Sequence, residues 1–92
     1  MIAIRHLEGE EWQVTVDLET RTEHRVRVTE ADLRRFGAGH SVEELLKASF
    51  EFLLEREPNT SILNSFDLPV IGRYFSEYEK EIKKKLCSSG TT

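Results

Sequence analysis

Hydrophobic and polar residues alternate along the first third of the chain. In the stretch WQVTVDLE every second residue from Trp12 to Leu18 is apolar, and EHRVRVT repeats this spacing from His24 to Val28. A shorter version of the pattern appears in IAIRHL, near the N-terminus. A period of two predicts strands with one buried and one wet face. The short polar connections between the three stretches favour an antiparallel meander.

Two capping boxes follow the strands and predict two helices. Thr29 is followed three residues later by Asp32, and Ser41 by Glu44, which is the spacing of reciprocal caps at helix N-termini. The first helix is short, because the glycines of GAG stop it. The second is the main helix, and it ends where Pro58 disfavours helical geometry in the preceding residue.

The main helix is apolar over about 200° of its circumference, more than one sheet can cover. Residues 61–82 supply the second cover and break into three pieces. A helical turn is predicted to start at Ser61, and a second short segment is predicted to be capped by Asp67. A last helix opens at Ser76, where Glu79 again has capping-box spacing.

The sequence therefore predicts a single α+β domain over residues 1–86. It consists of an antiparallel three-stranded meander, a packed main helix and a broken C-terminal helical segment. Residues 87–92, with the sequence CSSGTT, are predicted to form a disordered tail.

Composition narrows the class of protein further. The chain has 92 residues, of which 38% are hydrophobic, enough for one modest core. The single cysteine, Cys87, excludes a disulfide within the chain and favours a reducing cytoplasm. Neither a signal peptide nor a membrane span is expected, and a net charge of −4 argues against an indiscriminate nucleic-acid binder.

Little in the chain points to catalysis. The three histidines, His6, His24 and His40, have no metal-ligand spacing, and no phosphate-binding glycine loop or nucleophile elbow is present. His24 shares a register with buried valines, which is typical of a histidine at the edge of a core. No metal, cofactor or catalytic residue is therefore expected, and a small enzyme is the third-ranked function.

An aromatic-rich segment is the first candidate functional surface. Aromatic side chains that exceed the room in a small core tend to lie in interfaces. Three interpretations stay open here: a core role only, self-association, or binding of a different partner protein. The candidate partner-binding residues are Phe66, Val70, Ile71, Arg73, Tyr74, Phe75 and Tyr78.

Arginines form the second candidate surface. Arg5, Arg25 and Arg27 share the wet face of the predicted sheet, and Arg34 and Arg35 follow on the next helix. Guanidinium groups bind phosphate backbones, so RNA or an acidic partner is one interpretation. A solvated sheet face is the other, and it is favoured because this face has no exposed aromatic for base stacking.

Two resemblances accompany these patterns. Residues 12–86 resemble a group of small uncharacterised bacterial proteins, most specifically in the motif SIL…SFDLPVIGRYF. This resemblance implies a bacterial, cytoplasmic protein and gives no catalytic residues. The strands followed by VEELLKASFEFLLE resemble the layout of HicB-type antitoxins. The chain lacks the proline-glycine-cysteine turn typical of those antitoxins, and nothing after Pro58 matches them.

These observations favour a small non-catalytic cytoplasmic module for protein–protein interaction, expected to form a homodimer. It is expected to engage a partner through residues 62–78 or through the edge of the sheet. Toxin neutralisation is one concrete form of this function. The alternative is an RNA-associated regulator that uses the arginine-bearing sheet face.

Overall fold

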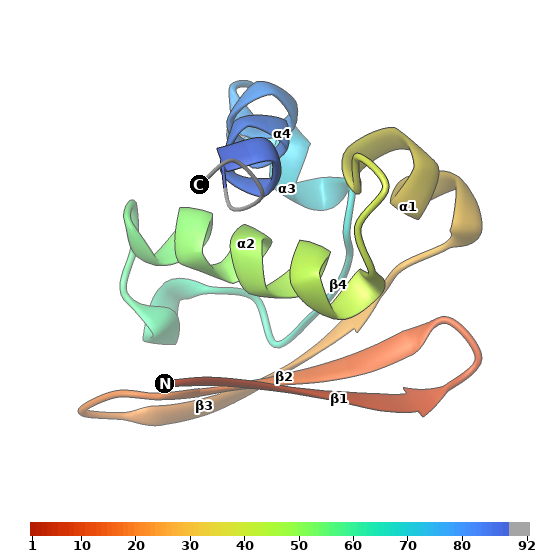
Figure 1. Cartoon of the computed structure of the whole chain (residues 1–92). Coiled ribbons are helices and arrows are strands. Elements are labelled where there is room, and N and C mark those ends of the chain that lie inside the picture. The colour runs from red at the N-terminus through yellow and green to blue at the C-terminus, as the bar shows by residue number, and fades with distance from the viewer. Residues whose placement is uncertain (89–92) are drawn as a thin grey trace.

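Three antiparallel strands form the meander that the alternating pattern predicts. They are β1 (Ile2–Glu8), β2 (Glu11–Asp17) and β3 (Arg21–Arg27), paired in that order in a computed structural model that describes residues 1–88 (Figure 1). A fourth short strand, β4 (Ser65–Asp67), pairs parallel to β3. The predicted α+β class is confirmed, with one strand more than the sequence indicated.

Four α-helices complete the fold: α1 (Glu30–Phe36), α2 (Val42–Leu54), α3 (Val70–Tyr74) and α4 (Tyr78–Ser88). Of the three predicted capping boxes, those at Thr29 and Ser41 are present, since their hydroxyls accept hydrogen bonds from the backbone N–H groups three residues later. Helix α4 begins at Tyr78, two residues after Ser76, and the carbonyl of Glu77 accepts a hydrogen bond from the N–H of Glu81. Helix α4 runs two residues past the predicted end of the domain, and residues 89–92 of the predicted tail lie outside the described residues.

Two segments near residue 61 differ from the sequence prediction. A 3₁₀ turn covers Asn59–Ser61, and β4 takes the place of the helical turn predicted to follow Ser61. Helix α3 begins at Val70, directly after Pro69, whose fixed φ is compatible with the start of a helix, and no side-chain cap is present there. Asp67 is therefore the last residue of a strand and not the cap of a helix.

Helix α2 lies in the middle of the molecule, between the sheet and the other helices (Figure 1). Phe50 contacts the ring of His24 on the sheet side, and Phe52 contacts the ring of Tyr78 from α4 on the opposite side. The wide apolar surface of α2 is thus covered twice, as its sequence requires. The buried apolar residues are Val14, Val16, Val26, Val28, Phe36, Leu45, Leu46, Ala48, Phe50, Phe52, Leu53, Ile62, Leu68, Ile71, Tyr78, Ile82 and Leu86.

Ion pairs connect α4, and the residue before it, to the other helices. They join Arg35 to Glu79 at 2.9 Å, Arg56 to Glu77 at 3.2 Å and Lys85 to Glu55 at 2.8 Å. The hydrogen bond from Lys85 lowers the pKa of Glu55, and that from Arg35 lowers the pKa of Glu79. Exposed ion pairs of this kind contribute little to the free energy of unfolding. Their role is to orient α4, whose contact with α2 is stabilised mainly by apolar burial.

Candidate functional site: an apolar groove beside Tyr74

The structure divides the seven predicted partner-binding residues into three groups. Ile71 and Tyr78 are buried, with exposed fractions of 3% and 0%. The side chains of Phe66, Val70 and Phe75 are half-buried, and those of Arg73 and Tyr74 are exposed. The segment is therefore both core and surface: burial removes Tyr78 from contact with a partner and leaves Ile71 only a small exposed fraction.

Tyr78 is the larger correction. Its hydroxyl lies 2.7 Å from the hydroxyl of Ser49, and its ring packs against Phe36 and Phe52. Ser49 uses its single proton to bond the carbonyl of Leu45, so the Tyr78 O–H donates to Ser49. Burial raises the pKa of Tyr78 well above its ordinary value. Tyr78 is a core residue with a satisfied polar end.

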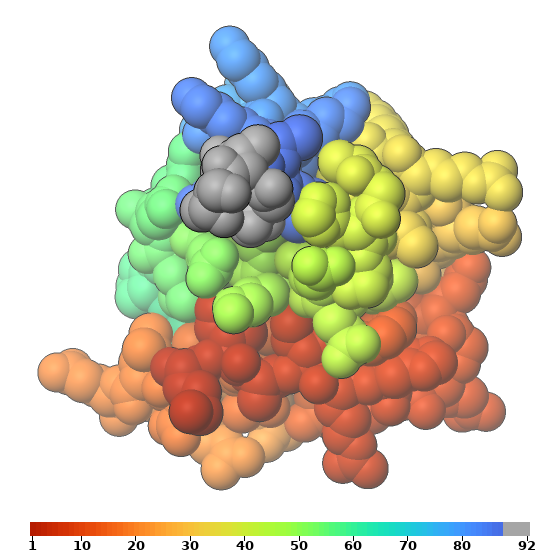
Figure 2. All heavy atoms as spheres, in the orientation of Figure 1, coloured from red at the N-terminus to blue at the C-terminus, as the bar shows by residue number. Residues whose placement is uncertain are grey.

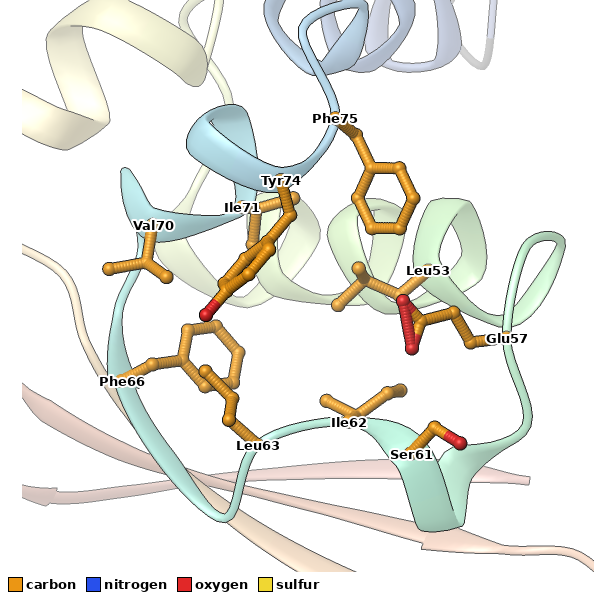
Figure 3. A pocket seen from close by; sticks show the side chains of 10 residues that line it. All are labelled: Leu53, Glu57, Ser61, Ile62, Leu63, Phe66, Val70, Ile71, Tyr74 and Phe75. Carbon is orange, nitrogen blue, oxygen red and sulfur yellow. The ribbon is translucent and has the colours of Figure 1, made fainter.

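A groove of about 220 Å³ opens between α3, the end of α2 and the segment that precedes β4 (Figure 3). The candidate residues that line it are Phe66, Val70, Ile71, Tyr74 and Phe75. The lining residues that the sequence analysis did not single out are Leu53, Glu57, Ser61, Ile62 and Leu63. Of these, Ile62 and Leu63 lie within residues 62–78, the segment expected to bind a partner, and their adjacent apolar side chains were the available signal.

Polar contacts fix the wall of the groove that precedes β4. The Nδ1 atom of buried His24 lies 2.7 Å from the carbonyl oxygen of Leu63, and its Nε2 lies 2.9 Å from the Thr22 hydroxyl. The same hydroxyl accepts a hydrogen bond from the Asn59 side chain, which also bonds the carbonyl of Thr20. This wall is therefore attached to β3, and His24 is the buried core-edge histidine that its register predicted.

The opposite wall belongs to the helices. Phe75 meets the ring of Phe52 edge-on at 5.8 Å, which anchors the chain just after α3. Tyr74 precedes it and is 68% exposed. In Figure 3 its ring extends across the mouth of the groove towards Phe66 and Leu63. An exposed aromatic ring beside an apolar groove is a typical arrangement at binding surfaces.

The electrostatic character of the groove is simple. Glu57 is its single charged lining residue, and no ion pair joins Glu57 to another residue within the range 1–88. The other polar groups in the lining are the hydroxyls of Ser61 and Tyr74. Among the residues that line the groove, Glu57 has no second acid or base with which to form an acid–base pair.

The arginine surface is neutralised by acids of the same chain. Arg25 lies 3.3 Å from Glu11, and Arg27 lies 3.0 Å from Glu10. The hydrogen bond to Glu10 raises the pKa of Arg27, and the charge of Asp67 adds to this effect. Acids interleaved with arginines leave the sheet face with mixed charge, which does not favour a phosphate backbone.

The other two candidate arginines do not extend the sheet face. Arg34 pairs with Glu30 along α1, and Arg35 reaches across to Glu79 on α4. The physical reason is that α1 turns away from the sheet and packs with α2 and α4 (Figure 1). The structure thus separates Arg34 and Arg35 from Arg5, which keeps the position on the wet face that its register predicted.

Among residues 1–88, no group of three or more His, Cys, Asp or Glu side chains is placed to hold a metal ion. No helix in this range combines the length and apolarity that crossing a membrane requires. No protein-family model, curated protein or solved structure matches the chain. The resemblances noted in the sequence therefore stay predictions.

Proposed function

We propose that this protein is a small, non-catalytic, cytoplasmic interaction protein whose groove binds an apolar segment of a partner protein. The observation that carries the proposal is the exposed Tyr74 ring beside a groove lined by Leu63, Phe66 and Phe75. Tyrosine is enriched among the few residues that contribute most of the binding energy of an interface.

The size and charge of the groove define its occupant. Pockets for drug-sized ligands and cofactors span roughly 300–1,000 Å³, so a groove of about 220 Å³ fits one or two apolar side chains. Glu57 adds a negative charge to the lining. The matching partner is a peptide segment with an apolar anchor and a lysine or arginine that reaches Glu57.

The proposal has one more specific form and one alternative. Toxin neutralisation, suggested by the layout of VEELLKASFEFLLE, is one form of binding a partner protein. The RNA-associated alternative has less support, because Arg25, Arg27, Arg34 and Arg35 all pair with acids in the chain. A labelled oligonucleotide that bound in a salt-dependent way at low ionic strength would place RNA binding above protein binding.

Affinity capture with matched variants identifies the partner. Leu63→Ser alters the groove, and Leu18→Ser alters a similarly exposed leucine in the turn between β2 and β3; their exposed fractions are 47% and 52%. A partner protein that binds in the groove should be captured by wild type and by Leu18→Ser after nuclease treatment. The same protein should be lost with Leu63→Ser and with Tyr74→Ala. Loss with both leucine variants, or with neither, contradicts the proposal.

Binding of the purified partner then tests the chemistry. Tyr74→Ala is expected to weaken binding by about tenfold or more, as truncation of a central aromatic anchor does. A partner peptide whose basic residue is replaced by glutamine should bind wild type more weakly. Glu57→Gln should bind both peptides alike. A preference for the basic peptide that survives in Glu57→Gln would contradict the proposed role of Glu57.

A further inference from the structure

The two edges of the sheet are protected to different degrees. The β4 edge has three residues, and Pro69 follows soon after, so it offers few groups for pairing. The β1 edge has seven residues with neither proline nor lysine. Natural proteins shorten exposed edges or protect them with proline, lysine or bulges, because unpaired backbone groups invite another strand. By this measure β1 is the less protected edge, although it carries one arginine, Arg5, and a bulge at its far end, between His6 and Glu8.

Hydrogen bonds at the start of β1 show which backbone groups point outward. Met1 and Asp17 exchange both backbone bonds, at 2.8 and 2.9 Å. Hydrogen-bonded and non-hydrogen-bonded pairs alternate along antiparallel strands, so Ala3 and Arg5 also direct their N–H and C=O groups to β2. The residues between them direct these groups away from the sheet: Ile2, Ile4 and His6.

We propose that β1 pairs with β1 of a second copy of this chain, antiparallel, about a two-fold axis at Ile4. In this register Ile4 lies opposite Ile4, and Ile2 lies opposite His6 of the second copy. All of these residues direct their backbone groups outward, which gives about six hydrogen bonds across the axis. The two sheets then continue as one, a known mode of strand addition at a free edge.

The side chains support this register over the one centred on Arg5. On the inner face, Ile2 and Ile4 are half-buried in one copy and pack against the core, so a second copy covers their remaining exposed surface. On the outer face, Arg5 lies opposite the small Ala3 of the second copy. A register centred on Arg5 instead places two arginines directly opposite each other, which is destabilising.

Charge repulsion between the α2 helices of the two copies opposes this dimer, because α2 lies over β1. Its exposed side chains carry net negative charge: Glu43, Glu44, Lys47 and Glu51. The proposed axis brings this surface towards its counterpart in the second copy. Screening by salt weakens such repulsion, so the dimer is expected to become tighter as salt is added.

The groove and the proposed interface occupy different parts of the molecule. The strand order is β1-β2-β3-β4, and Phe66 of β4 lines the groove. Residues of the N-terminal strands (red) lie at the surface below α2 in Figure 2. Pairing through β1 therefore leaves both grooves open, at opposite ends of the joined sheet. The proposal does not depend on what the groove binds.

Charge substitutions at Ala3 test the register, because Ala3 is exposed on the outer face. Ala3→Glu places an acid opposite Arg5 of the second copy, whereas Ala3→Arg places like charges together. Each pair occurs twice in the dimer, so the dissociation constant should fall or rise about two- to thirtyfold. The double variant Ala3→Arg with Arg5→Glu should restore tight pairing. Sedimentation equilibrium over a range of protein concentrations measures all four proteins.

Backbone hydrogen exchange supplies an independent readout. On dimerisation the amides of Ile2, Ile4 and His6 should become protected, whereas those of Ala3 and Arg5 are protected in the monomer as well. The proposal is overturned if wild type and Ala3→Glu both stay monomeric up to about 1 mM. It is also overturned by a dimer that ignores the charge at residue 3 or dissociates in Tyr74→Ala.

Discussion

Tyr74 and Tyr78 stand four residues apart, a spacing that puts two side chains on one face of a continuous helix. In this protein they have opposite environments: Tyr74 is 68% exposed and Tyr78 is fully buried. The cause is Phe75, whose backbone is extended with φ −130° and ψ 100°, so that α3 ends before α4 begins. The break in the helix, and not the composition of the segment, assigns one tyrosine to the core and the other to the surface.

This difference divides two tasks within one short segment. Tyr78 joins α4 to α2 and closes the second layer over the main helix. Tyr74 is mostly exposed and lies beside the groove. Core and binding surface are therefore separable by substitution, and three measurements sharpen or break the separation.

The largest effect is expected from truncation of the buried ring. Tyr78→Ala should lower the free energy of unfolding by about 3–5 kcal/mol, because it leaves a cavity beside Phe36 and Phe52. Tyr74→Ala, the matched control, should change it by less than about 0.5 kcal/mol. Urea unfolding followed by circular dichroism measures both. Equal losses in the two variants would mean that the two tyrosines do not differ in role.

An intermediate effect is expected at alkaline pH. Burial raises the pKa of Tyr78 in the folded protein, whereas an unfolded tyrosine ionises near pH 10. The stabilisation from keeping Tyr78 neutral is therefore complete below about pH 10 and is lost as the pH rises further, by up to about 1.4 kcal/mol per pH unit.

Tyr78→Phe, which has no ionisable ring, provides the comparison. Unfolding free energies of both proteins from about pH 9 to about pH 11 should diverge above pH 10, with wild type falling more steeply. Parallel curves would show that Tyr78 ionises as easily in the folded chain as in the unfolded chain.

The smallest effect is expected from removal of the Tyr78 hydroxyl, and Ser49→Ala, which leaves that hydroxyl in place, is its comparison. Tyr78→Phe should cost about 1 kcal/mol, since Ser49 keeps its bond to the carbonyl of Leu45. Ser49→Ala should lower the free energy of unfolding by about 1–3 kcal/mol, because it leaves the buried Tyr78 hydroxyl without the oxygen to which it donates. The double variant should cost less than the sum of the two. Strict additivity in the unfolding free energies would argue that the two hydroxyls do not interact.

The parts of the fold that sequence could predict are those encoded locally. Alternation marks β1 to β3, and the capping boxes at Thr29 and Ser41 place α1 and α2, because the relevant partners lie within a few residues. The strand β4 escaped prediction because Ser-Phe-Asp is too short to show a period. Its pairing with β3 depends on how α1 and α2, which separate the two strands in the sequence, pack in the fold.

The candidate site was predictable only in outline. The apolar excess of residues 61–82 indicated a binding surface, yet the burial of Tyr78 depends on the direction in which the chain turns at Phe75. The arginine surface shows the same limit. Arg35 and Glu79 are 44 residues apart in the chain, and their pairing follows from how α4 packs on α1.

The parallel pairing of β4 with β3 also sets an order of events during synthesis. β3 ends at Arg27, whereas β4 begins at Ser65, so translation at about 5–20 residues per second leaves roughly 2–8 s between them. During this interval β3 is a second open edge, and His24 has not yet met the carbonyl of Leu63. In the nascent chain, the exposed Arg25 and Arg27 on β3 disfavour pairing of this open edge with another strand, because charged residues discourage edge-to-edge pairing. This protection matters until residues 63–67 cover the edge.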